Sequence, residues 1–293
     1  MNLFTMNVMS DALHKRTTVN VLCPREAVRG MEVPTLMLLH GMTDDQSGWI
    51  RHTLAEEYAE EAGVCLVIPN ADLSFYTDMA YGGAYLMFLA EELPHILQNY
   101  FPIAVGKQQN YVAGNSMGGY GAFLLAMRYP QRYRAAFSLS GPMKIAWIHR
   151  ILSDESLARI YAAGDEDRLR ACVERLGRQE RIPARLVYSL LESGDLTRIF
   201  RGMFGEQGVE LDGSDVDLME LVRRSAFREN AVELYAYCGE QDYHYESNRL
   251  FSDLAASMNI AYRLQTGPGS HDWKYWNRQL PQVFHMISEW RKG

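Results

Sequence analysis

A serine stands between two glycines in the run Gly-Asn-Ser-Met-Gly at positions 114–118. The spacing G-x-S-x-G is typical of a sharp turn from a strand into a helix, which exposes the serine hydroxyl for nucleophilic attack. Apolar residues precede the run at 111–113 and follow it at 120–127, as such a turn requires. The alternative is a glycine-rich turn without a catalytic role. The pattern predicts Ser116 as a nucleophile toward a carbonyl carbon.

A serine hydroxyl is a weak nucleophile and needs a neighbouring base to take its proton, a task that histidine performs near neutral pH. The chain has eight histidines. His271 alone follows a late apolar strand pattern (261–265) and a Gly/Pro turn (266–270). The chain order serine, acid, histidine is typical of folds with this serine turn. His271 is therefore the predicted general base, although a lone loop histidine is more often simply solvated.

The acid that orients the base should follow the preceding strand, at 233–238, and two carboxylates do so. Asp242 is favoured because it lies farther from the strand end and has the shorter side chain, while Glu240 stays open as the alternative. Asp242, His244 and Glu246 also form a weak candidate metal trio, because no further ligands lie nearby.

Attack on a carbonyl creates an oxyanion, which backbone N–H groups can stabilise. Met117 is one predicted donor, because it begins the helix after the serine, where N–H groups lack partners. Met42 is the second, because it follows His40 and Gly41 at the end of an apolar strand, and glycine lets the backbone turn there.

Aromatic residues near these loops are candidates for lining a substrate pocket, although they are equally often core residues. The four candidates are Trp49, Tyr81, Tyr85 and Trp273. No cofactor or metal is expected. The acidic stretch 212–217 does not match a calcium-binding EF-hand loop, because Asp217 stands where that loop requires glycine.

The elements that must position these residues alternate between strands and helices. Two half-exposed strands are predicted at 3–9 and 17–22, and buried strands at 34–39, 64–68, 110–113, 135–139, 232–238 and 261–265. Helical patterns fall at 49–61, 85–97, 117–128, 248–258 and 273–291. The alternation predicts an α/β-hydrolase fold, with eight mostly parallel strands and helices on both faces.

The stretch 143–230 contains no convincing strand and is rich in Arg, Glu and Leu. It is predicted to be a helical cap inserted into one α/β domain that spans residues 1–293. Its arginines are interpreted mainly as a solvated helical face.

Composition limits the partners. The formal net charge of −7 disfavours nucleic acid as a partner. No apolar run reaches the roughly 20 residues that cross a bilayer, and the first ten residues do not resemble a signal peptide. The four cysteines are widely spaced and interpreted as reduced, so a cytoplasmic protein is expected. The expected partner is a small-molecule ester substrate. The sequence leaves the oligomeric state, including a homo-oligomer, undecided.

The chain resembles the esterase D-like putative esterase family, and most closely its tributyrin esterase branch of short-chain acyl esterases. The matching segments are 38–42 with Trp49, 69–70, 75–78, 81–82, 113–121, 137–141, 213–218, 238–242 and 269–273. The resemblance implies metal-independent hydrolysis of acetyl- and butyryl-type esters, with Ser116, Asp242 and His271 as triad and Met42 and Met117 as oxyanion donors. Feruloyl esterases and S-formylglutathione hydrolases belong to the wider family. The stretch 144–207 departs most from the tributyrin esterases.

Two more remote hypotheses remain. A serine peptidase can use the same three residue types, but such enzymes typically carry an extra domain, for which this sequence gives no sign. A non-catalytic hydrolase scaffold would be expected to lack at least one of the three residues, and all three are present.

Overall fold

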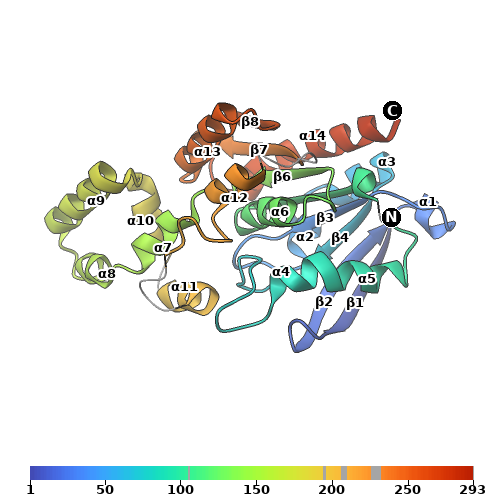
Figure 1. The fold of residues 1–293 in the computed structure, drawn as a ribbon, viewed down its shortest axis with the longest axis horizontal. Coiled ribbons are helices and arrows are strands. Elements are labelled where there is room, and N and C mark those ends of the chain that lie inside the picture. The colour runs from blue at the N-terminus through green and yellow to red at the C-terminus, as the bar shows by residue number, and fades with distance from the viewer. Residues whose placement is uncertain (105, 194–195, 206–209, 226–231, 293) are drawn as a thin grey trace.

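One sheet of eight strands runs through the computed structural model, which describes residues 1–104, 106–193, 196–205, 210–225 and 232–292. Its strands are β1 (Asn2–Ser10), β2 (Lys15–Cys23), β3 (Thr35–Leu39), β4 (Cys65–Pro69), β5 (Asn110–Asn115), β6 (Ala135–Leu139), β7 (Glu233–Gly239) and β8 (Tyr262–Gly267). Their order across the sheet is β1-β2-β4-β3-β5-β6-β7-β8 (Figure 1).

The first two strands form an antiparallel hairpin at one edge, and β2 pairs antiparallel with β4. The strands from β4 to β8 run parallel in register across the rest of the sheet. The carboxyl ends of β5, β7 and β8 therefore meet at one edge, where ligands bind in open α/β sheets. The mostly parallel sheet predicted from the sequence is confirmed.

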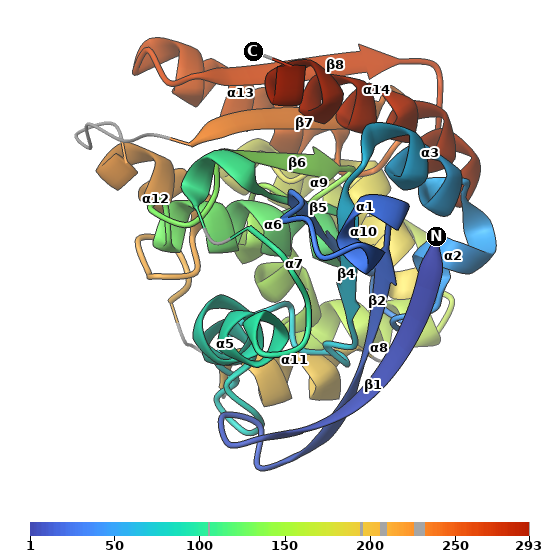
Figure 2. The same cartoon turned by 90° about the vertical axis from the view of Figure 1, so that its right-hand side faces the viewer.

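Helices cover both faces of the sheet. Outside the segment between β6 and β7 they are α1 (Arg25–Val28), α2 (Gly48–His52), α3 (Ala55–Ala62), α4 (Tyr85–Met87), the π-helical turn η1 (Phe88–Glu92), α5 (Leu93–Gln98), the 3₁₀ turn η2 (Lys107–Gln109), α6 (Met117–Arg128), α13 (Tyr245–Ser257) and α14 (Trp273–Lys292). In β3, Leu36 and Leu38 join the core under α3 and α14, whereas Met37 and Leu39 join the core under α6. Helices α3 and α14 lie side by side (Figure 2).

The single helix predicted at 49–61 is wrong in one respect, because the structure divides it into α2 and α3. Thr53 has an extended backbone (φ −139°, ψ 173°) and ends the first helix. Its hydroxyl then accepts a hydrogen bond from the Ala55 N–H at 3.2 Å. A β-branched polar residue that bonds the backbone locally favours such a break.

Among the described residues between β6 and β7 there are six helices: α7 (Ile145–Leu152), α8 (Glu155–Ala162), α9 (Glu166–Glu180), α10 (Ala184–Glu192), α11 (Thr197–Phe204) and α12 (Leu218–Ser225). Helices α8, α9 and α10 project away from the sheet, and α12 returns to pack near α6 (Figure 1). Within the described part of the predicted cap (143–230), no strand occurs. Residues 194–195, 206–209 and 226–230 of that prediction lie outside the described residues.

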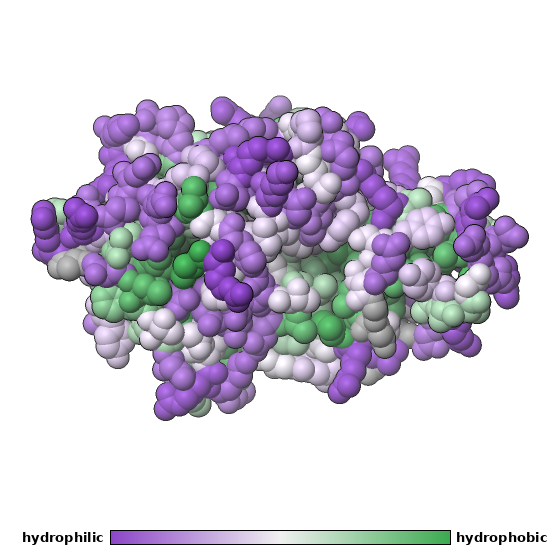
Figure 3. Space-filling view, turned by 180° about the vertical axis from the view of Figure 1, so that it is seen from behind, coloured by the Kyte–Doolittle hydropathy of each residue, from purple (hydrophilic) through white to green (hydrophobic). Residues whose placement is uncertain are grey.

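None of the helices in the described part of the chain is both long and apolar enough to pass through a membrane. The face seen in Figure 3 is mostly hydrophilic, and hydrophobic side chains show between the hydrophilic ones in patches.

Candidate active site

Ser116 lies in the turn between β5 and α6, with the backbone in a conformation that L-residues rarely adopt (φ 51°, ψ −119°). The two flanking glycines allow this turn because nothing larger fits. A Cβ on Gly114 would lie 2.3 Å from the carbonyl carbon of Gly118, and one on Gly118 would lie 2.2 Å from the Leu39 carbonyl oxygen. The strained turn holds the Ser116 side chain beyond the sheet edge.

The structure brings the side chains of Ser116, His271 and Asp242 together at this edge. The Ser116 hydroxyl donates to Nε2 of His271 across 2.8 Å, and Nδ1 of His271 donates to Oδ2 of Asp242 across 2.9 Å. The three residues come from the loops after β5, β8 and β7, which the parallel register places side by side. Such an arrangement can pass the serine proton to the imidazole while the carboxylate fixes the ring.

Asp242 is fully buried, whereas the Glu240 side chain is exposed. Oδ1 of Asp242 accepts a hydrogen bond from the His244 backbone N–H at 2.8 Å, so both carboxylate oxygens of Asp242 have partners. Burial works to raise the pKa of Asp242, but the charge and hydrogen bond of His271 and the contacts with His244 outweigh it and hold that pKa below its usual value. The geometry thus favours Asp242 over Glu240 as the carboxylate beside His271.

His244, a member of the candidate metal trio, lies beside the three residues Ser116, His271 and Asp242. Its ring is buried and meets His271 edge-on, with the ring centroids 5.3 Å apart. Burial, followed by the nearby charge of His271, lowers the pKa of His244 to about 3. Glu246, the third member of the candidate metal trio, pairs instead with Arg185 at 3.4 Å.

The backbone N–H groups of Met42 and Met117 have no hydrogen-bond acceptor among the described residues. Met117 begins α6, where the helix dipole favours negative charge. Met42 lines the same cavity as Ser116. Both donors are therefore available for an oxyanion formed on a substrate carbonyl.

His40 and Tyr76 support the Met42 loop, a role that the sequence did not indicate. The buried His40 ring donates from Nδ1 to the Gly41 carbonyl (2.8 Å) and accepts at Nε2 from the Ala71 N–H (3.0 Å). The buried Tyr76 hydroxyl donates to the His40 carbonyl at 2.7 Å. Burial lowers the pKa of His40, so the ring stays neutral, as these two bonds require. The carbonyls of His40 and Gly41 are thereby held in place.

A cavity of about 680 Å³ opens over Ser116 and His271. Trp273 lines it, as predicted, and so do Tyr243 and Trp276, which the sequence interpretation missed. Trp276 donates its indole N–H to the buried Ser140 hydroxyl at 3.0 Å and meets the His271 ring edge-on. Burial raises the pKa of Tyr243, and a side-chain hydrogen bond with Ser189 works against that rise.

The structure does not bring the other three predicted pocket aromatics to this cavity. Trp49 is fully buried on the inner side of α2, where its indole N–H donates to the Leu39 carbonyl at 3.0 Å. Tyr81 is 65 % exposed and does not line this cavity. Tyr85 lines a neighbouring cavity of about 600 Å³, which shares Thr43 and Asp44 with the first.

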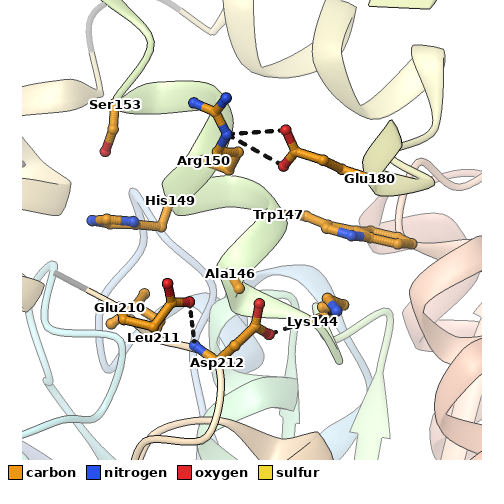
Figure 4. A pocket seen from close by; sticks show the side chains of 10 residues that line it. All are labelled: Lys144, Ala146, Trp147, His149, Arg150, Ser153, Glu180, Glu210, Leu211 and Asp212. Carbon is orange, nitrogen blue, oxygen red and sulfur yellow. Dashed lines mark hydrogen bonds and ion pairs between the residues drawn. The ribbon is translucent and has the colours of Figure 1, made fainter. Parts of the chain in front are cut away.

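Another cavity, of about 650 Å³, lies beside α7 and α9 and is lined by none of Ser116, Asp242 and His271. Figure 4 shows the residues that line it, with Arg150 paired to Glu180 on one side and Lys144 near Asp212 on the other. The charges of these four residues have partners of opposite sign. This cavity shares no lining residue with the cavity over Ser116.

Residues 10–287 match the model of a protein family described as “Putative esterase”. The chain belongs to this family. It is accordingly an ester hydrolase, as the sequence predicted.

Individual relatives of this esterase agree with that membership. The chain is 24 % identical to an acetyl esterase of Caldicellulosiruptor saccharolyticus over 299 residues, covering 99 % of each protein. It is 29 % identical to an S-formylglutathione hydrolase of Paracoccus denitrificans over 163 residues, which is 47 % of this chain and 57 % of that one. The solved structure of the fluorophosphonate-binding serine hydrolase F of Staphylococcus aureus superposes with a TM-score of 0.78 over 98 % of both chains, at 24 % identity. The α/β-hydrolase fold is thereby confirmed.

Proposed function

We propose that this esterase is a serine carboxylesterase that cleaves short acyl esters through an acyl-enzyme, with Ser116 as nucleophile, His271 as general base and Asp242 as the orienting acid. The observation that carries the proposal is the continuous path of hydrogen bonds from Ser116 Oγ to His271 (2.8 Å) and on to Asp242 (2.9 Å). No metal or cofactor takes part in the proposed reaction.

In the first step, Ser116 Oγ bonds to the ester carbonyl carbon while its proton passes to Nε2 of His271. The carbonyl oxygen becomes an oxyanion, which accepts hydrogen bonds from the Met42 and Met117 N–H groups. When the intermediate collapses, the bond to the alcohol oxygen breaks, and the alcohol leaves with the proton from His271. Water then loses a proton to His271, attacks the acyl carbon and releases the acid, and Ser116 regains its proton.

Acetyl- and butyryl-type esters are the proposed substrates. The full-length similarity to an acetyl esterase supports this choice. S-formyl thioesters are the second candidate, supported by the partial similarity to an S-formylglutathione hydrolase, and feruloyl esters the third, supported by the fold of a ferulic acid esterase. The cavity of about 680 Å³ has room for a larger leaving group than methanol or ethanol.

The test is hydrolysis of p-nitrophenyl acetate by Ser116→Ala. We expect kcat to fall by several orders of magnitude, on the order of 10⁶ as in related triads. Ser257→Ala, an exposed serine on α13, serves as the matched control and should keep full activity. Retained activity in Ser116→Ala would remove Ser116 from the mechanism.

A panel of acetyl, butyryl, feruloyl and S-formyl substrates distinguishes the candidates by kcat/KM. The proposal expects the acetyl or butyryl ester to lead, and a peptide amide to be cleaved far more slowly. If the S-formyl substrate had the highest kcat/KM, the proposed substrate class would change and the proposed triad would not.

The cytoplasmic location stays a prediction, supported by four cysteines that are all free.

A further inference from the structure

The ring of Tyr243 lies against the imidazole of His271. Their centroids are 4.4 Å apart and their planes meet at 33°, so the two rings are in contact in a tilted arrangement. Nδ1 and Nε2 of His271 are already engaged, with Asp242 and Ser116 respectively. Tyr243 therefore covers a face of the ring, whereas Trp276 meets it edge-on at 5.1 Å and 89°.

An aromatic face attracts a cation within about 6 Å of its centroid, because the ring quadrupole is negative there. In the proposed reaction the imidazole of His271 takes the Ser116 proton and becomes a cation. A contact with Tyr243 is therefore stronger in the charged state, and only such differential contacts accelerate the chemical step.

Helix α10 of the inserted segment holds the loop that carries Tyr243. Arg185 donates from Nη1 to the Glu240 carbonyl at 2.9 Å, and its Nη2 lies 3.4 Å from a Glu246 oxygen. These contacts fix the residues on both sides of Tyr243.

We propose that Tyr243 is a positioning residue, which orients the imidazole of His271 and stabilises its protonated form during the reaction, and that Arg185 of α10 holds Tyr243 in place for this purpose. The proposal rests on the proposed function, since it requires His271 to act as the base. It also gives the inserted helices a part in the chemistry in addition to any contact with substrate.

The sharpest test keeps the ring and changes only its quadrupole. Tyr243→Phe retains an aromatic face, whereas Tyr243→pentafluorophenylalanine has nearly the same shape with the opposite polarity. Both are compared by kcat, KM and the pH profile of kcat/KM with p-nitrophenyl acetate. We expect Tyr243→Phe to stay within about threefold of the parent. In the fluorinated variant kcat should fall about tenfold with little change in KM, which is about 1.4 kcal/mol.

The acidic limb of the pH profile provides a readout that packing alone would not move. Loss of a contact that favours imidazolium should shift this limb to lower pH in the fluorinated variant and leave it in place in Tyr243→Phe. Among the described residues, the titratable side chains that contact His271 are Asp242, His244 and Tyr243, and only the residue at position 243 differs between the two variants.

Equal kcat values and equal acidic limbs in the two variants would overturn the electrostatic role. For the second part, Arg185→Leu should lower kcat several-fold, whereas Arg178→Leu, an exposed arginine on α9, should not. An unchanged kcat in Arg185→Leu would overturn that part. Ser116→Ala and His271→Ala are measured in parallel. Activity retained in these two would refute the proposed function itself, whereas their loss alongside unaffected Tyr243 variants would refute only this inference.

Discussion

At the scale of single residues, Asp242 uses its two carboxylate oxygens for two partners, the His271 ring and the His244 backbone N–H. In Asp242→Asn, an amide N–H takes the place of Oδ2 and faces the N–H of His271, or the amide turns away from the ring. In either case the imidazole is no longer held in its tautomer and orientation. We expect Asp242→Asn to lower kcat by about 10⁴. The measurement is steady-state hydrolysis of p-nitrophenyl acetate.

Glu240 supplies the matched control, because it lies on the same loop with an exposed side chain. Glu240→Gln should keep kcat within about twofold of the parent, as surface substitutions usually do. A large loss in Glu240→Gln together with a small loss in Asp242→Asn would show that the carboxylates have been assigned in the wrong order.

The sequence could predict Ser116 as nucleophile and His271 as base because each follows a strand pattern at a position typical of the α/β-hydrolase fold. It could not choose firmly between Glu240 and Asp242, because both side chains fit a loop after β7 and only their burial separates them. The hydrogen bond from Tyr76 to the Met42 loop could not be predicted from the sequence for another reason. Its hydroxyl bonds a residue 36 positions away, and no local pattern encodes that contact.

At the scale of elements, the turn at Ser116 depends on close packing between α6 and the end of β3. A Cβ on Gly118 would lie 2.2 Å from the Leu39 carbonyl oxygen and 2.8 Å from that of His40. Gly118→Ala must therefore move helix or strand, which we expect to lower the free energy of unfolding by about 1–3 kcal/mol and to misplace the oxyanion donors. Urea unfolding and kcat measure the two effects.

Gly106→Ala is the control for that substitution, because nothing lies within 4 Å of a Cβ at this position. Its unfolding free energy should stay within about 0.5 kcal/mol of the parent. A Gly118→Ala protein as stable and as active as Gly106→Ala would contradict the close packing described for the turn.

Element positions were largely predictable, because buried parallel strands give short apolar runs and helices give a longer period. The side of the helix on which a residue lies was harder to predict. Trp49 was predicted near the pocket from its place shortly after the Met42 loop, yet α2 turns it inward to the Leu39 carbonyl. The break at Thr53, which separates α2 from α3, is likewise not visible in the apolar spacing.

At the scale of the whole molecule, the buried His244 links stability to pH. Burial, aided by His271, lowers its pKa from 6.5 to about 3 in the folded state. As pH falls below 6.5, the unfolded chain takes up a proton at this position and the folded chain does not, so the free energy of unfolding decreases until about pH 3.

We expect this one group to cost about 2 kcal/mol of stability between pH 7 and pH 5. His244→Leu removes the titrating group and should lose correspondingly less stability over that interval. Urea unfolding at the two pH values measures the difference. His285→Gln, an exposed histidine on α14, should keep the parent's pH dependence. The same pH dependence in His244→Leu and the parent would refute a neutral buried His244.

The most direct measurement of the central claim is mass spectrometry after a brief exposure to a fluorophosphonate probe, which reacts with an activated serine. We predict one adduct per chain, located on the peptide that contains Ser116, and strongly slowed labelling in His271→Ala. An adduct on another serine, or labelling at the parent rate in His271→Ala, would contradict activation of Ser116 by His271.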